Sequence, residues 1–243
     1  MRWEKAIAHT DRVSRKYRKE IADSIQDTVI YGGPDGMPQE VTRTESQGRQ
    51  IAFANTDTVS ALLSHCSGKT AVLNFASYKN PGGGFMNGSM AQEEALCHES
   101  TLYNVISTFG DYYSWNKAHN NHSLYEDRML YSPGIVFERG GNAVKADVIT
   151  CAAPNVSAFA GGSETNKNVL IARAGFIKAA AEAHGIDTII LGAYGCGVFG
   201  QDPREVAAAF LGVFADTNIK KVVYAVPGTD ENARIFREVF ARQ

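Results

Sequence analysis

The sequence predicts an α/β fold: a three-layer α/β/α sandwich with a mixed, largely parallel sheet and an N-terminal helical extension. From Gln50 onward, short apolar runs alternate with longer segments of helical periodicity. The apolar runs are unbroken, which is typical of strands that are buried on both faces of a sheet. Strand–helix alternation also implies crossover connections, and these join parallel strands. With 243 residues, the chain is long enough to bury a substantial core.

The individual elements follow from the periodicity in chain order. Apolar residues at mostly helical spacing predict one or two amphipathic helices from about Trp3 to Ile30, and prolines and glycines break this pattern from Gly32 to Gly48. We therefore expect an N-terminal helical accessory segment, residues 1–48, and a main domain, residues 49–243, packed as one unit. The expected strands are Ile51–Ala54, Ala71–Phe75, Asp147–Ala152, Thr188–Leu191 and Val222–Val226. The expected helices lie near Thr58–His65, Gln92–Phe109, Asn166–His184, Pro203–Ala215 and Asn232–Phe240.

Two parts of the main domain differ in the clarity of their pattern. The helix from Pro203 has a well-marked start, because Asp202 can cap it and proline suits the first helical position. The region Gly110–Gly141 is rich in Tyr, Asn and Gly and shows no regular periodicity. We expect this region to be an insertion or a covering loop.

Composition and charge exclude several classes of protein. Lys and Arg total 24 against 26 for Asp and Glu, so the net charge is −2 and no basic surplus supports general nucleic-acid binding. No apolar stretch approaches the roughly 18 residues of a membrane-spanning helix, and no apolar secretory signal is present. The four cysteines form no CxxC pair, which fits reduced thiols in the cytoplasm. We therefore expect a cytoplasmic monomer without membrane contacts or sequence-specific nucleic-acid contacts.

Two glycine-rich loops follow predicted strands. The first runs from Asn74 to Phe85 and leads toward the helix at Gln92, and the second runs from Gly192 to Gly200 and leads to the helix at Pro203. In open α/β sheets, ligands bind where the carboxyl ends of the strands meet. Glycines let the backbone approach a ligand closely, so that successive N–H groups can hold an anion. A phosphate group can thus bind without lysine, although glycine-rich turns also occur simply where a chain must turn tightly.

Two familiar kinds of site, a dinucleotide-binding motif and a metal site, do not fit the sequence. Gly195, Gly197 and Gly200 match GxGxxG, but the next strand ends at Val226 without the acid that a dinucleotide-binding domain needs. His119 and His122, with Glu126 nearby, could form a metal site, but no fourth ligand is apparent and a polar loop readily holds two solvated histidines. We therefore expect neither a metal nor a redox cofactor.

The triplet Gln92-Glu93-Glu94 opens the helix after the first loop. Acids in a first helical turn often only complement the helix dipole. Here they follow a loop with three successive glycines, and two crowded carboxylates can shift each other's pKa. The triplet is therefore a candidate source of an acid/base residue.

At these residues the sequence resembles the bacterial-type poly(ADP-ribose) glycohydrolases, a branch of the macrodomain superfamily. Their signature is a triple glycine, a spacer of six to eight residues and Gln-Glu-Glu. Here Gly82-Gly83-Gly84 is followed by the seven residues 85–91 and then by Gln92-Glu93-Glu94. The Ala153-Pro154-Asn155 segment and the Gly195–Phe199 loop resemble the family in order and spacing. The resemblance runs from about Ile51 to the C-terminus and is less specific in the N-terminal helices.

The resemblance implies a macrodomain-like catalytic domain and a role for each matched residue. Glu94 would be the catalytic acid/base, and Glu93 would hold hydroxyl groups of the distal ribose. Asn80 and the triple glycine would wrap that ribose, the second loop would bind the diphosphate, and Pro154 and Asn155 would lie near the adenosine end. One departure is His98, where an arginine is expected. The implied substrate-binding residues are Asn80, Gly82, Gly83, Gly84, Gln92, Pro154, Asn155, Gly195, Cys196, Gly197, Val198 and Phe199.

The function that the resemblance implies is hydrolysis of the ribose–ribose O-glycosidic bonds of poly(ADP-ribose), which releases ADP-ribose. The expected partners are ADP-ribose and its polymer on modified proteins. Two alternatives use the same loops: a reader that binds ADP-ribose without cleaving it, and a hydrolase of single ADP-ribosyl groups. An intact carboxyl pair favours an enzyme over a reader, because only hydrolysis needs an acid/base residue.

Overall fold

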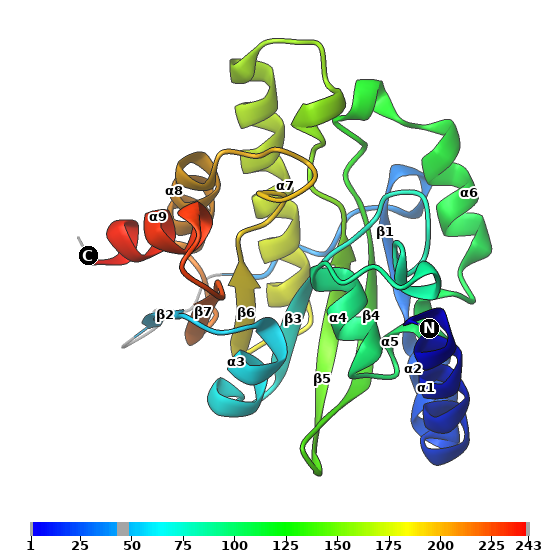
Figure 1. Ribbon diagram of the computed structural model, residues 1–243. Helices are drawn as coiled ribbons and strands as arrows, with labels where there is room; N and C mark the ends of the chain where they lie inside the picture. Colours follow the sequence, from blue (N-terminus) through cyan, green and yellow to red (C-terminus); the bar gives the residue numbers. More distant parts are fainter. Residues whose placement is uncertain (1, 43–48, 242–243) are drawn as a thin grey trace.

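The computed structural model describes residues 2–42 and 49–241, and its strands form one mixed sheet (Figure 1). The strands are β1 (Val29–Gly32), β2 (Gln50–Ala54), β3 (Thr70–Phe75), β4 (Arg128–Arg139), β5 (Asn142–Cys151), β6 (Thr188–Gly192) and β7 (Lys221–Ala225). Their spatial order is β1-β4-β5-β3-β6-β7-β2. β4 runs antiparallel to both of its neighbours, and all other neighbouring pairs are parallel. The predicted mixed, largely parallel sheet is confirmed.

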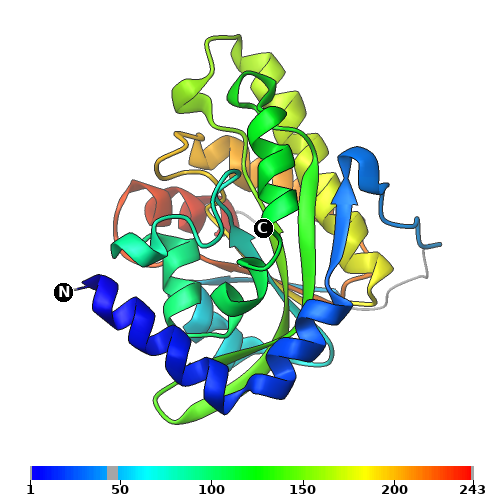
Figure 2. The same cartoon turned by 90° about the vertical axis from the view of Figure 1, so that its right-hand side faces the viewer.

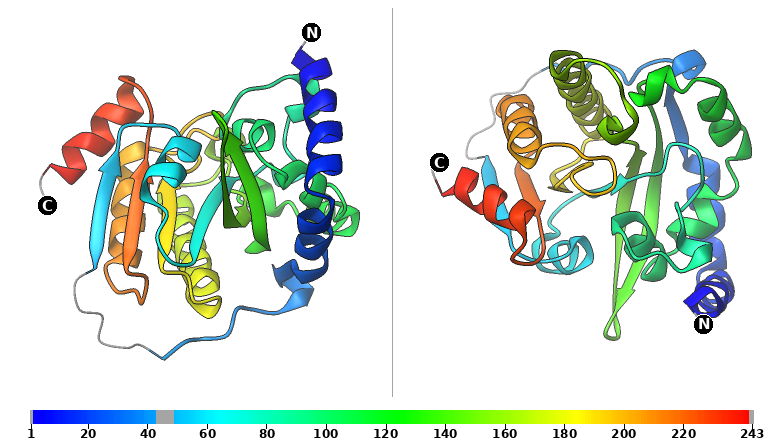
Figure 3. Two further views of the ribbon diagram at one scale, coloured as in Figure 1. Left: turned by 90° about the horizontal axis from the view of Figure 1, so that it is seen from below. Right: turned by 45° about the horizontal axis from the view of Figure 1, so that its top comes forward.

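Helices cover both faces of this sheet (Figures 2 and 3). They are α1 (Arg2–Lys16), α2 (Arg18–Asp27), α3 (Thr58–His65), α4 (Gln92–His98), α5 (Leu102–Ile106), α6 (Gly110–Ala118), α7 (Ser163–Ala183), α8 (Pro203–Phe214) and α9 (Glu231–Phe240). Buried side chains of α7 and α8 form one core cluster with one face of the sheet, and those of α3 to α6 form a second cluster with the other face. The predicted three-layer sandwich is therefore confirmed.

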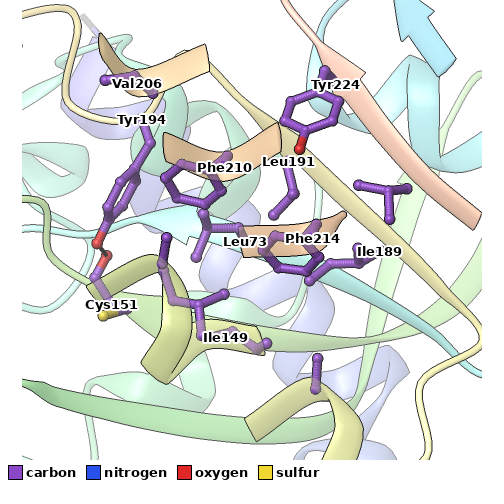
Figure 4. Packing of buried hydrophobic residues seen from close by; sticks show 14 of the residues in the cluster. Leu73, Ile149, Cys151, Ile189, Leu191, Tyr194, Val206, Phe210, Phe214 and Tyr224 are labelled. Carbon is purple, nitrogen blue, oxygen red and sulfur yellow. Dashed lines mark hydrogen bonds between the residues drawn. The ribbon is translucent and has the colours of Figure 1, made fainter. Parts of the chain in front are cut away.

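The core under α8 holds the strands that precede the two glycine-rich loops. Figure 4 shows Phe210 of α8 close to Leu73 of β3 and Leu191 of β6. Just after β6, the hydroxyl of Tyr194 donates a hydrogen bond of 3.1 Å to the carbonyl of Cys151. β3 and β6 are neighbouring parallel strands, so the loops that follow them leave the same edge of the sheet.

The prediction of a covering loop over Gly110–Gly141 is largely wrong, because this region contains α6 and the long strand β4. Pro133 and Gly134 interrupt the strand pattern in the sequence. The structure accommodates them in a β-bulge between Ser132 and Ile135, where Gly134 has a φ of +68°. Only residues 119–127, between α6 and β4, form a covering loop.

A tertiary contact also divides the helix that was predicted over Gln92–Phe109. Ser100 forms a β-bridge with Phe137, and the Thr101 N–H donates to the Val136 carbonyl. These bonds to β4 end α4 and separate it from α5. The strand predicted over Asp147–Ala152 is longer than expected, since β5 begins at Asn142 as the partner of β4 in a hairpin.

The N-terminal segment contributes to the sheet as well as covering it. Its two helices are confirmed, and β1 pairs with β4 as an edge strand that was not predicted. α1 packs against the short 3-10 helix Phe85–Asn87 that follows the triple glycine, and His9 Nε2 lies 2.8 Å from the Ser100 carbonyl oxygen. The expected boundary between residues 48 and 49 borders residues 43–48, which lie outside the described residues.

Candidate active site

The two glycine-rich loops lie side by side and line one cleft of about 370 Å³, together with the first turn of α4. A second hollow of about 240 Å³ adjoins the cleft, because Phe75, Ala91, Gln92 and Ala193 line both. The residues that line the cleft are Phe75, Ala76, Ser77, Gly83, Ala91, Gln92, Glu93, Glu94, Ala153, Ala193, Gly195, Gly197, Val198 and Phe199. The sequence motifs at separate strand ends are thus brought together.

Gln92 attaches the start of α4 to the end of β3. Its Oε1 accepts a hydrogen bond of 2.9 Å from the Phe75 N–H, and its Nε2 donates to the Leu73 carbonyl at 2.9 Å. A single amide therefore satisfies a donor and an acceptor of the strand backbone. This pairing determines where the next two residues of the triplet lie, although the resemblance implied only substrate binding for Gln92.

Glu93 is a buried carboxyl group, 3% exposed, in the lining of the cleft. The Ser77 N–H donates to its Oε2 at 2.7 Å, and Asn74 Nδ2 donates to its Oε1 at 3.1 Å. Burial raises the pKa of Glu93 to about 8, and the adjacent Glu94 carboxylate contributes to the rise. The donors from Ser77 and Asn74 lower the pKa but do not outweigh the burial.

This raised pKa predicts a pH-dependent stability. Because the folded protein holds the Glu93 proton up to about pH 8 and an unfolded chain releases it near 4.5, the wild type should lose stability as the pH rises between these values. At about 1.4 kcal/mol per pKa unit, the loss is on the order of a few kcal/mol. Urea unfolding of wild type and Glu93→Gln at pH 5, 6.5 and 8 should show the variant gaining stability relative to wild type. A difference in stability between the two proteins that stays constant with pH would contradict the raised pKa of Glu93.

Glu94 has one oxygen held and one without a partner. The Gly84 N–H donates a hydrogen bond of 2.7 Å to Oε1. Oε2 is shielded from solvent and has no hydrogen-bond partner among the described residues. Glu94 is 7% exposed and lines the cleft. One oxygen is thus oriented by the triple glycine, and the other remains available to exchange a proton with a bound group.

The triple glycine leaves room for the two carboxyl groups. Gly83 has a φ of +56°, and a Cβ atom there would lie 2.6 Å from Glu94 Oε1 and 3.0 Å from Glu93 Oε2. At Gly82, which also has a positive φ, a Cβ would lie 2.7 Å from the ring of Tyr103. Glycine is therefore required at both positions by the backbone conformation, and also by the carboxylates at Gly83 and by the Tyr103 ring at Gly82.

The second loop presents free backbone donors to the cleft. The N–H groups of Gly197, Val198 and Phe199 donate no hydrogen bond to another described residue. Gly197 and Phe199 line the cleft, as does Val198, whose side chain is 84% exposed. Successive free N–H groups form a concave site for an anion. Cys196, directly before them, packs against the core, and burial, followed by the Asp202 charge, raises the pKa of its thiol to about 12.

Six of the candidate residues do not line the cleft: Asn80, Gly82, Gly84, Pro154, Asn155 and Cys196. Asn80 is exposed at the edge of the first loop, where its carbonyl accepts from the Gly83 N–H. The Pro154 carbonyl accepts a hydrogen bond of 2.8 Å from Gln201 Nε2, and the Asn155 N–H donates to the Ser123 carbonyl. Pro154 and Asn155 therefore connect the loop after β5 to its neighbours.

Sequence reasoning missed Asn74 and Ser77 as partners of Glu93. Both lie at the start of the first glycine-rich loop, Asn74–Phe85, where β3 ends. That position was the available signal, because the end of a strand at the ligand-binding edge supplies both side-chain and backbone donors.

The described residues contain no group of three or more His, Cys, Asp and Glu side chains arranged to hold a metal ion. His119 stacks on Trp115 with ring centroids 3.8 Å apart, so its imidazole has a structural contact. Cys97 is fully buried in the core, and burial raises the pKa of its thiol. No helix in residues 2–42 or 49–241 has the length and hydropathy needed to cross a membrane.

The fold and the cleft define a class of protein, a three-layer α/β enzyme that brings free backbone donors and a pair of carboxyl groups to one ligand. Enzymes that hydrolyse glycosidic bonds commonly use carboxyl groups as acid, base or nucleophile. The chain belongs to the family of microbial-type PARG catalytic domains, since the model of that family, "Microbial-type PARG, catalytic domain", matches residues 4–140. The proteins of this family are poly(ADP-ribose) glycohydrolases, and the resemblance in the sequence is confirmed. The match includes the N-terminal helices, where the motifs alone placed the resemblance from about Ile51 onward.

Solved structures of bacterial poly(ADP-ribose) glycohydrolases are similar over nearly the whole chain. The enzyme from Thermomonospora curvata is 30% identical, with a TM-score of 0.87, and the match covers 99% of this chain and 98% of that one. The same enzyme bound to the inhibitor ADP-HPD is 28% identical, with a TM-score of 0.84 and coverage of 100% and 99%. The Deinococcus radiodurans enzyme in complex with ADP-ribose is 28% identical, with a TM-score of 0.77 and coverage of 91% and 97%. A comparison with curated proteins gives no match.

Proposed function

We propose that this chain hydrolyses the ribose–ribose O-glycosidic bonds of poly(ADP-ribose) and releases ADP-ribose, with Glu94 as the general acid/base. Membership of the PARG catalytic-domain family and the likeness to the bacterial enzymes support the activity. The observation that carries the role of Glu94 is its carboxyl group in the cleft, with Oε1 held by the Gly84 N–H and Oε2 unpartnered among the described residues.

The lining of the cleft supports one orientation of the ligand. The distal ribose lies at Glu93 and Glu94, where Glu93 holds ribose hydroxyls, and the diphosphate lies at the free N–H groups of residues 197–199. Recognition by backbone donors suits a chain with a net charge of −2. We place the adenosine end in the adjoining hollow, which is mostly apolar and includes Val59, Leu96 and Pro227. This placement differs from the one at Pro154 and Asn155 that the resemblance implied.

Cleavage proceeds in two proton transfers at the same carboxyl group. Glu94 donates its proton to the 2′-oxygen of the leaving ribose as the glycosidic C–O bond breaks through an oxocarbenium-like state. The diphosphate, held close by, stabilises the developing cation. Glu94, now a carboxylate, then accepts a proton from water as the water oxygen bonds to the anomeric carbon, which regenerates the acid and completes hydrolysis.

Incubation with labelled poly(ADP-ribose), and separately with a mono-ADP-ribosylated protein, tests this function. We expect free ADP-ribose to be released from the polymer. Tight binding of ADP-ribose without any release would indicate a reader and contradict the proposal. Release from the mono-modified protein alone would indicate a hydrolase of single ADP-ribosyl groups.

We further propose a macrodomain-like catalytic domain that acts as a monomer in the cytoplasm. The four cysteines are free thiols, which supports a reducing compartment. The arrangement of the two glycine loops around one cleft supports the macrodomain-like assignment.

A further inference from the structure

Arg173 is a buried charge that takes no part in the proposed chemistry. It lies in the middle of α7 and is 1% exposed. A guanidinium group stays charged in proteins, so its burial requires partners for its donors. Nε donates to the Asp127 carboxylate, Nη1 donates to the Ala152 carbonyl, and Nη2 donates to the Tyr125 carbonyl at 3.1 Å. Arg173 thus joins α7 both to the end of β5 and to the covering loop, residues 119–127.

The covering loop has an unfavourable backbone at the point where Arg173 holds it. Asn121, His122, Ser123 and Tyr125 all have φ between 43° and 72°, a region that residues with a Cβ atom rarely adopt. Such a run persists only where the surroundings determine it. The hydrogen bonds from Arg173 to carbonyl groups of the loop are among the contacts that hold this backbone in place.

The ring of Tyr125 contacts an aromatic residue from each glycine-rich loop. It stacks on Tyr78 of the first loop, with centroids 4.2 Å apart and planes 12° apart. Its edge contact with Phe199 of the second loop has a centroid distance of 6.0 Å. Tyr78 is itself held, because its hydroxyl donates to the His119 carbonyl at 3.0 Å. Phe199 lines the cleft, so Tyr125 contacts a residue of the cleft wall.

We infer that Arg173 and Tyr125 are positioning residues: Arg173 holds the covering loop so that the ring of Tyr125 keeps Phe199 in place in the wall of the cleft, beside the bound diphosphate. This inference rests on the proposed function. The contact between Tyr125 and Phe199 acts on substrate binding rather than on proton transfer, because neither ring touches the carboxyl pair in the contacts that the structure describes. Its loss should therefore raise KM and leave kcat nearly unchanged.

A double-mutant cycle between Tyr125 and Phe199 tests the inference. We expect Tyr125→Leu and Phe199→Leu each to raise KM for the polymer by about tenfold, with kcat within about twofold of wild type. The KM of the double variant should be no higher than that of either single variant, because both substitutions remove the same contact. Tyr125→Phe keeps the ring and should keep the wild-type KM. Arg173→Lys keeps the charge but loses the forked donors, so it should raise KM like Tyr125→Leu.

Ile177→Val in the same helix is the matched control. Ile177 is fully buried in the core one turn after Arg173, so the variant should lower Tm and leave KM unchanged. Additive effects in the cycle, or an unchanged KM in Tyr125→Leu, would overturn the inference while the wild type still cleaves polymer. A wild type that neither binds ADP-ribose nor releases it from polymer would overturn the proposed function instead. If Arg173→Lys does not fold, the double-mutant cycle between Tyr125 and Phe199 still tests the inference.

Discussion

Replacement of Glu94 by glutamine is expected to lower polymer hydrolysis by about 10²–10⁴-fold, the usual contribution of a general acid or base. Glutamine has nearly the same shape as glutamate, and its carbonyl oxygen can still accept the hydrogen bond from the Gly84 N–H. It cannot donate a proton to a leaving hydroxyl or accept one from water. ADP-ribose binding should therefore stay near the wild-type value, as measured by calorimetry, while the turnover number falls.

Glu205→Gln is a suitable control for this experiment. Glu205 also lies in the first turn of a helix, α8, but it does not line the cleft. The control should keep wild-type turnover. Unchanged turnover in Glu94→Gln would contradict the role of Glu94 as general acid/base. Loss of turnover in Glu93→Gln alone would assign that role to Glu93 instead.

A methyl group at Gly83 should lower kcat/KM on the order of 10²-fold, the effect of a displacement of about 1 Å at a reacting group. The added Cβ would lie 2.6 Å from Glu94 Oε1 and 3.0 Å from Glu93 Oε2, so both carboxyl groups must move. The movement also disturbs the hydrogen bond from the Gly84 N–H. Steady-state kinetics of Gly83→Ala on labelled polymer measure the loss.

The substitution at Gly83 also strains the backbone, and Gly140→Ala separates this effect from the clash. Gly140 has a φ of +59°, close to the +56° of Gly83, but a Cβ there would meet nothing within 4 Å. A left-handed backbone costs about 1–2 kcal/mol in a residue with a Cβ atom, so both variants should lose similar stability in urea unfolding. Only Gly83→Ala should lose activity. Equal activity in the two variants would show that the carboxyl groups do not depend on the glycine.

In the main domain, α3, α7, α8 and α9 and the parallel strands β2, β3, β6 and β7 were predictable because each repeats a short local pattern. The capped start of α8 is an example, since the Asp202 side chain accepts from the Arg204 N–H as its position before Pro203 predicts. β4 was not predictable, because Pro133 and Gly134 break its pattern and only pairing with β5 makes the bulge acceptable. The break between α4 and α5 likewise depends on the contact of Ser100 with a strand that follows 37 residues later at Phe137.

For the candidate site, the sequence by itself determined which motifs are candidates: the triple glycine, the pair of glutamates after it and the second glycine loop are contiguous motifs with recognisable spacing. Only the tertiary structure decided that they share one cleft, and how deeply each side chain is buried there. The pKa of Glu93 depends on burial beneath segments from other parts of the chain. The contact between Tyr125 and Phe199 joins residues 74 positions apart, and Arg173 supports it from a third segment. Desolvation and packing arise between distant segments, so no local pattern in the sequence encodes them.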